Sequence, residues 1–111
     1  MAISIYSSNI VDAYDTSLTR TTASSLSVSR GNLATTTVDN FALFGGGYDD
    51  SGNSYYSTVD AYDTSLTRTT ASGLSTIRGN LAATSIGNYA LFGGGENYSA
   101  YLSIVDVYKC D

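Results

Sequence analysis

The sequence contains no histidine, no proline and no tryptophan, and Cys110 is its only cysteine. Without histidine, the chain lacks the commonest general base and the commonest metal ligand of proteins. Its many serines and threonines have no neighbouring base that would activate them as nucleophiles. We therefore expect no enzyme activity, no metal and no cofactor. A single cysteine cannot form a disulfide within one chain, and Cys110 is expected to be an inert thiol near the chain end.

Positive charge is also scarce, with five Lys and Arg against ten Asp and Glu and a net charge of −5. Nucleic acids and anionic membrane surfaces are bound through basic patches, so the sequence predicts neither as a partner. No apolar run approaches the roughly 18 residues that a transmembrane helix needs. Residues 1–6 lack the basic and apolar regions of a signal peptide. The sequence does not indicate in which cellular compartment the protein resides.

What the sequence does contain is an internal repeat. Residues 11–26 read VDAYDTSLTRTTASSL, and residues 59–74 read VDAYDTSLTRTTASGL, 48 positions later. The match continues to the glycines at 45–47 and 93–95, and a third, shortened copy begins at Val105. A repeat period between about 20 and 50 residues is typical of solenoids, propellers and arrays.

Turn residues divide each repeat into four short segments without a helical apolar period. Asp39-Asn40, and Gly87-Asn88 in the second copy, predict tight hairpin turns. Asp63-Thr64-Ser65 predicts a further turn, because short polar side chains bond to nearby backbone. The expected strands of the first full repeat are 33–38, 41–44, 55–62 and 66–71. Short connections favour antiparallel pairing, so we predict an all-β fold of four-stranded antiparallel meanders.

The order of these features resembles the kelch repeat. Glycines close the second strand, a loop follows, and the third strand carries Val-Asp-x-Tyr-Asp at 59–63. An arginine also precedes the first strand of each copy. The resemblance implies kelch-type β-propeller blades of about 50 residues each. Kelch blades usually carry a tryptophan on the fourth strand, and that region of this chain holds Arg20 and Arg68 instead.

On this resemblance the chain is a single repeat domain with two repeats. Residues 1–29 form a partial blade with its last two strands, residues 30–74 form a complete blade, and residues 75–111 form a partial blade with its first three strands. Propellers close with roughly 4–8 blades. A chain of two repeats therefore does not close by itself.

We expect closure by oligomerisation, with three chains giving a six-bladed homotrimer. The N-terminal hairpin of one chain could supply the fourth strand that the last blade of the next chain lacks. The count is not perfect, because nine strands per chain exceed the eight of two blades. The alternative is that the chain is a piece of a longer array. The end at 109–111 departs from the repeat, which favours a true C-terminus.

The long, variable connections are expected on one face, because strand direction alternates in a meander. Loops on a rigid scaffold usually carry binding residues. We predict a ligand site at Arg30, Arg78, Tyr48 and Tyr98. The kelch resemblance implies that the arginines lie near a channel mouth, where they would bind an anion or acidic peptide. The tyrosines would stack on a sugar or peptide. The alternatives are that each arginine pairs with a nearby aspartate or carbonyl and that the tyrosines pack at blade edges.

Two other motifs are weaker. Residues 49–53 carry oxygen donors of the kind that bind calcium, but their spacing is not that of an EF-hand, so a solvated turn is favoured. The triple glycines lack the Lys-Ser/Thr of a phosphate-binding loop.

The sequence thus predicts a non-enzymatic kelch-repeat propeller module for protein or glycan binding. One alternative is a sugar-processing propeller enzyme of the mutarotase type. Near-identical blades would give it only symmetric rings of side chains, which are poorly suited to asymmetric chemistry. The copper-radical type is excluded, because it needs histidine ligands. Another alternative is a purely structural or engineered propeller fragment.

Overall fold

The computed structural model of the chain describes residues 7–49 and 53–109. These residues form strands and turns and no helix, which confirms the prediction of an all-β fold. Every strand pair in this part of the chain is antiparallel. Consequently, no helix in the two described ranges is long or apolar enough to cross a membrane.

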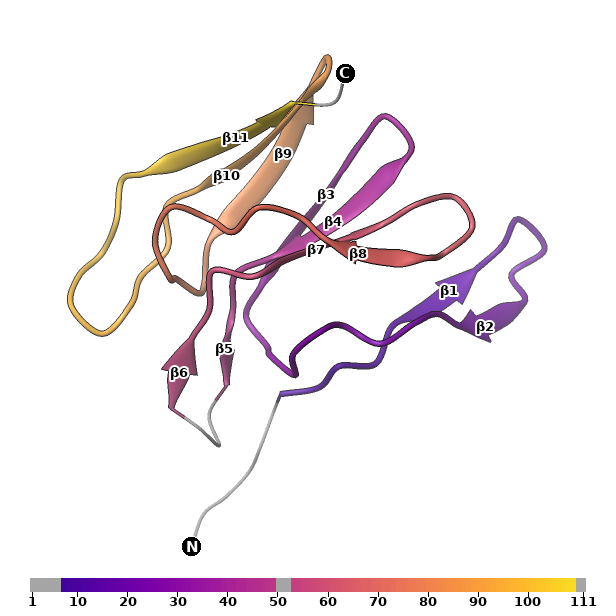
Figure 1. Cartoon of the computed structure of the whole chain (residues 1–111), viewed down its shortest axis with the longest axis horizontal. Helices are drawn as coiled ribbons and strands as arrows, with labels where there is room; N and C mark the ends of the chain where they lie inside the picture. Colours follow the sequence, from indigo (N-terminus) through magenta and orange to yellow (C-terminus); the bar gives the residue numbers. More distant parts are fainter. Residues whose placement is uncertain (1–6, 50–52, 110–111) are drawn as a thin grey trace, which may run out of the picture.

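The strands fall into two larger sheets and two small hairpins (Figure 1). The first larger sheet has the order β3-β4-β7-β8, and the second has the order β11-β10-β9. The pairs β1-β2 and β5-β6 form the hairpins. The strands are β1 (Asp12–Tyr14), β2 (Arg20–Thr22), β3 (Ala34–Val38), β4 (Phe41–Gly45), β5 (Tyr48–Asp49), β6 (Ser54–Tyr55), β7 (Val59–Tyr62), β8 (Arg68–Thr70), β9 (Ala82–Ile86), β10 (Tyr89–Gly93) and β11 (Val105–Lys109).

The hairpin turns lie where their residues predict them. In the first larger sheet Val38 pairs with Phe41, so Asp39 and Asn40 alone connect β3 to β4. Asp39 has a φ of 51°, a left-handed conformation that aspartate tolerates better than most residues. In the second sheet Gly87 takes the same conformation, with a φ of 56°. The turn chemistry of both copies therefore sets the strand register.

Two of the predicted strand boundaries are wrong. The expected strand 55–62 is divided, because Tyr55 belongs to the separate β5-β6 hairpin and only residues 59–62 form β7. The expected strand 66–71 begins later, at Arg68, because Leu66 takes a left-handed φ of 62°. The Asp63 carboxylate accepts the Ser65 N–H at 2.9 Å and the Thr67 N–H at 3.1 Å, so the turn there is longer than expected.

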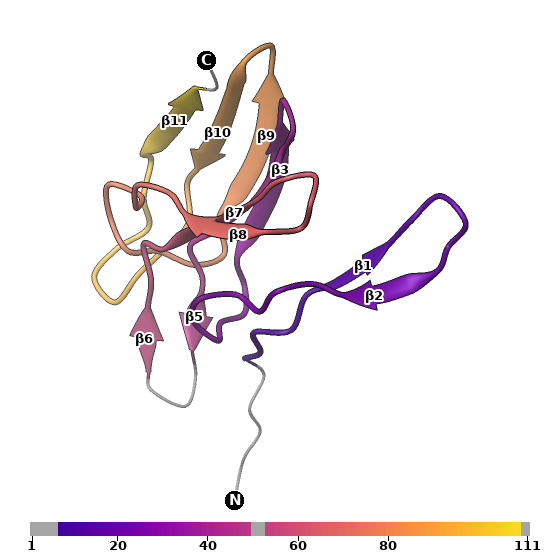
Figure 2. The ribbon, with the colours of Figure 1, turned by 45° about the vertical axis from the view of Figure 1, so that its right-hand side comes forward.

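The second larger sheet packs on one face of the first. Strand alternation places Leu43 of β4 and Ala61 of β7 on that face, and both are buried. The second sheet covers them with Ala90 and Phe92 of β10, which are 0% exposed. These side chains form the hydrophobic core of the described residues. The β1-β2 hairpin extends away from both sheets (Figure 2).

Gly45 lies at a point where the two sheets approach each other closely. A Cβ atom at residue 45 would lie 2.7 Å from Cε2 of the Phe92 ring, which is closer than real Cβ contacts. Gly93 is its counterpart in the second sheet, 48 positions later. A Cβ atom there would meet only Val105, with Cγ2 at 3.4 Å. The absence of a side chain at residue 45 thus allows Phe92 to reach the first sheet.

We expect Gly45→Ala to destabilise the chain by about 1–3 kcal/mol, the usual cost of overpacking a core. The matched variant Gly93→Ala should change the free energy of unfolding by less than about 0.5 kcal/mol. Both substitutions lower the backbone entropy of the unfolded chain by the same amount. The difference between their free energies of unfolding therefore isolates the contact with Phe92. Urea denaturation of dilute protein, followed by circular dichroism, measures it. Equal effects of the two variants would show that this contact does not limit the packing.

Candidate functional site

The two arginines predicted as ligand residues lie inside the protein. Arg30 precedes β3 and is 2% exposed, and Arg78 precedes β9 and is 0% exposed. Their neighbours Gly31 and Gly79 pair through the backbone with Tyr48 and Glu96 of the long loops. The guanidinium groups instead reach into the sheets, to aspartates on β7 and β11.

Arg30 connects three segments of the first larger sheet. Its Nη1 lies 3.2 Å from Oδ2 of Asp60 on β7, and both side chains are fully buried. Its Nε donates to the carbonyl oxygen of Gly46 at 2.6 Å, and its Nη2 donates to that of Phe44 at 3.0 Å. The charge is therefore compensated and the donors are used within the fold.

Arg78 repeats this arrangement in a more open form. Its Nη1 lies 3.0 Å from Oδ2 of Asp106 on β11, and its Nη2 donates to the Phe92 carbonyl oxygen at 3.0 Å. The Asp106 side chain is 19% exposed. The Nε of Arg78 has no hydrogen-bond partner among the described residues. The second copy of the ion pair is thus less completely satisfied than the first.

A serine completes each ion pair. The N–H and hydroxyl of Ser27 donate to the Asp60 carboxylate at 2.9 and 2.8 Å, and Ser75 donates to Asp106 in the same way at 3.0 Å. Burial alone would raise the pKa of Asp60, but the hydrogen bonds from Ser27 and the charge of Arg30 outweigh it and hold the pKa below 3.8. The pKa of Asp106 is lowered for the same reasons. Both carboxylates are therefore charged at neutral pH.

This geometry is that of the structural alternative, in which each arginine pairs with an aspartate. No specific aspartate was predicted as the partner, although Arg30 and Asp60 are 30 positions apart and Arg78 and Asp106 are 28 positions apart. A ligand role for Arg30 and Arg78 remains a prediction. The described strands form no closed ring, so a channel mouth beside these arginines also remains a prediction.

The two predicted tyrosines come together around a third. Tyr48 of β5 and Tyr55 of β6 have ring centroids 4.6 Å apart, and Tyr98 of the β10–β11 loop lies 4.9 Å from Tyr55, nearly perpendicular to it. The Tyr48 hydroxyl donates to Oδ1 of Asn53 at 2.6 Å. The Tyr98 hydroxyl donates to the Asn53 carbonyl oxygen at 2.5 Å. We call Tyr48, Tyr55 and Tyr98 the tyrosine cluster.

The tyrosine cluster lies at the loop end of the molecule (Figure 1). Tyr98 is 59% exposed, and residues 96–101 border an adjoining hollow of about 310 Å³. Burial and the nearby Glu96 carboxylate raise the pKa of Tyr55, which keeps its hydroxyl protonated. Sequence reasoning did not identify Asn53 and Glu96 as part of this site, although they lie in the same loops as the tyrosines. The site offers aromatic ring faces beside amide and carboxylate oxygens.

Two predictions fall wholly or partly outside the described residues. Of the calcium-like stretch 49–53, residues 50–52 are not described. Cys110 is also outside the described ranges.

We expect Arg30→Gln to destabilise the fold by about 3–5 kcal/mol, because it leaves the Asp60 carboxylate buried without its counter-charge. The control is Arg20→Gln, which breaks an exposed ion pair with Asp12, 3.5 Å apart. It should cost at most about 1 kcal/mol. Chemical denaturation measures both. If Arg30→Gln keeps wild-type stability and loses affinity for acidic peptides, the ligand role of Arg30 is supported and the structural role is wrong.

Acid should weaken the fold through Asp60 and Asp106. Because folding lowers the pKa of both groups below 3.8, their contribution to stability is present above that pH. It is lost as the pH falls through the lowered pKa values. We expect a constant urea midpoint between about pH 7 and 5 and a fall below about pH 4. Asp60→Asn should show a smaller fall, whereas the exposed control Asp12→Asn should behave like wild type. A midpoint independent of acid would contradict this assignment.

The chain was also compared with known proteins. No protein-family model matches it, and no curated protein is significantly similar to it. The kelch resemblance therefore depends on the residues quoted above, and the function has to be argued from the site.

Proposed function

We propose that the chain is a non-enzymatic binding module on a kelch-type β scaffold, assembled from several chains, and that its tyrosine cluster binds a glycan. The observation that carries this proposal is the tyrosine cluster itself, with a half-exposed Tyr98 ring beside a hollow of about 310 Å³. Loops on a rigid scaffold are the usual place for such a site.

The chemistry of the cluster suits a sugar. Tyrosine rings are flat and amphipathic, so they stack on the apolar face of a pyranose ring. The hydroxyl groups of a sugar also need acceptors, and Glu96 provides a carboxylate at the edge of the hollow. One oxygen of that carboxylate already accepts the Asn80 side-chain N–H at 2.6 Å, which holds it in place.

The state of the two arginine-paired acids supports a non-enzymatic role. A general acid at neutral pH needs a carboxyl group with a raised pKa. Asp60 and Asp106 have lowered pKa values and are held by arginine and serine. They are therefore suited to holding the strands of each sheet together, and not to proton transfer.

We expect Tyr98→Ala to weaken glycan binding about tenfold or more, as expected for the loss of an aromatic hot spot. Tyr98→Phe keeps the ring and removes the hydrogen bond to Asn53, so it should retain most of the affinity. The matched control is Tyr14→Ala, since Tyr14 is 64% exposed but lies on β1. A glycan array identifies the ligand, and titration calorimetry measures the affinities.

A peptide array is probed in parallel. If the chain binds peptides and no glycan, the proposed glycan ligand is wrong and the ligand is a protein segment. The site assignment is wrong if Tyr14→Ala weakens binding as much as Tyr98→Ala does.

A further inference from the structure

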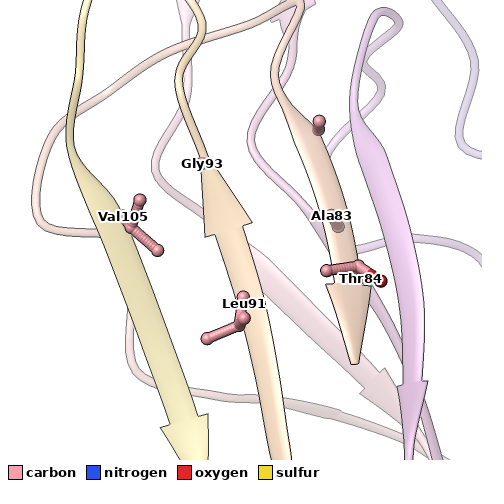
Figure 3. A pocket seen from close by; sticks show the side chains of 6 residues that line it. Ala83, Thr84, Leu91, Gly93 and Val105 are labelled. Atoms are coloured by element: carbon pink, nitrogen blue, oxygen red, sulfur yellow. The ribbon is translucent and has the colours of Figure 1, made fainter. Parts of the chain in front are cut away.

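The outward face of the second larger sheet is apolar and uncovered. Ile86, Val105 and Val107 are 66%, 58% and 55% exposed. Val105, Leu91 and Thr84 project from three neighbouring strands on the same side of this sheet (Figure 3). They border a hollow of about 260 Å³, together with Gly93, Ala82 and Ala83. We call this surface the open face.

The same positions form the core of the first sheet. Val38, Val59 and Ala61 are the repeat counterparts of Ile86, Val105 and Val107, and they are 6%, 0% and 6% exposed. Leu43, which is buried, likewise corresponds to Leu91. In the first sheet these side chains are buried because the second sheet lies on them. The open face is thus a core surface that lacks its cover.

The residues of the second sheet that cover the core face of the first sheet can also be named. Ala90, Phe92 and Tyr108 of the second sheet contribute to this cover, and the Phe92 and Tyr108 rings lie edge to face with their centroids 5.7 Å apart. Their counterparts in the first sheet are Ala42, Phe44 and Tyr62. Ala42 and Phe44 are half-buried, and Tyr62 is 3% exposed. We call the side of the first sheet that carries these three residues the back face. The chain therefore carries, on two different surfaces, both halves of an interface that it already forms internally.

The back face has the shape that the internal contact requires. The Phe44 and Tyr62 rings lie edge to face with their centroids 5.5 Å apart, as the Phe92 and Tyr108 rings do at 5.7 Å. The Tyr62 hydroxyl donates to the Ser24 carbonyl oxygen at 2.7 Å, and the Tyr108 hydroxyl donates to that of Ser72 at the same distance. The aromatic side chains of the back face are therefore held in the same way as their counterparts on the buried face of the second sheet.

We infer that the open face binds the back face of a second copy of this chain, and that this contact repeats the internal contact between the two sheets. Phe44 of the incoming copy would lie against Gly93 as Phe92 lies against Gly45. Gly93 has the space, because only Val105 is near the position of its missing side chain. Two different surfaces meet, so each docked copy presents a new open face, and the assembly grows until a ring closes.

The edge of the second sheet fits the same arrangement. This sheet has no fourth strand beside β11 within the described residues, and Tyr108 and Lys109 there border a hollow of about 250 Å³ shared with the first sheet. The incoming copy carries β2, the counterpart of β8, which pairs with β7 in the complete sheet. Both β1 and β11 are counterparts of β7. In the docked assembly, β2 of the incoming copy can pair either with its own β1 or with β11 of the other copy. To become the fourth strand beside β11, β2 must leave β1.

Two blocking variants test the head-to-tail contact. Ile86→Lys with Val107→Lys charges the open face, and Thr35→Lys charges the back face. Thr35 is exposed and is the counterpart of Ala83, which packs against the core. All three positions are exposed, so circular dichroism and urea denaturation should show that both variants are folded. The control is Tyr101→Lys. Tyr101 is 89% exposed and lies on neither of the two faces.

Native mass spectrometry and light scattering should find wild type and Tyr101→Lys as multimers of the same size. Each blocking variant alone should associate about tenfold more weakly or not at all. An equimolar mixture of the two should form a one-to-one complex and stop there, because only one productive pair of faces remains.

Three results would overturn the inference. Wild type could be monomeric at every concentration, the mixture could stay monomeric, or Thr35→Lys could assemble like wild type, which would mean that two open faces pair with each other. This inference rests on the assembly from several chains in the proposed function and does not depend on ligand binding. Tyr98→Ala should therefore assemble normally, and failure of the glycan proposal would leave the assembly unchanged.

Discussion

The contact between the Phe92 ring and the backbone of Gly45 determines how closely the two larger sheets approach. A β-strand alternates its side chains between two faces, so a glycine at one position leaves space for a ring from the neighbouring sheet. Phe92 and Ala90 enter this space and bury Leu43, Val59 and Ala61. The hydrophobic core is therefore an interface between two repeats, and neither repeat could form it alone. This explains why a nearly identical sequence is core in one copy and surface in the other.

The ion pairs connect strands within each sheet, which the packing between the two sheets does not do. Arg30 precedes β3, and its guanidinium reaches Asp60 on β7 and the end of β4, so one side chain links three neighbouring strands of a sheet. A buried charge is tolerated only when it is compensated and hydrogen-bonded, and Ser27 provides the remaining donors. The second pair, Arg78 with Asp106, lies at the open edge and is partly exposed. The least complete ion pair thus belongs to the sheet that lacks a neighbour.

Local chemistry made much of the fold predictable. The turns at Asp39-Asn40 and Gly87-Asn88 depend on residues adjacent in sequence, and both lie where expected. The end of the third strand lies at Tyr62 as expected, but the start of the fourth was not predictable, because the left-handed Leu66 gives no pattern in the sequence. The β5-β6 hairpin depends on tyrosine contacts between loops, so it also escaped prediction. The tyrosine site was partly predictable from residue type and loop position, whereas the Arg–Asp partners are distant in sequence and needed the structure.

An array of repeats is stabilised by the contacts between neighbours, and a terminal repeat normally carries a polar outer face. In the second larger sheet the outward residues Ile86, Val105 and Val107 are apolar, like their buried counterparts in the first sheet. The central claim is that this face is an unfilled copy of the internal interface. The thermal unfolding midpoint of wild type as a function of protein concentration tests it most directly. If copies cover the open face, the midpoint should rise over a roughly hundredfold increase in concentration, because association stabilises the folded state. A midpoint that does not change with concentration would contradict the account.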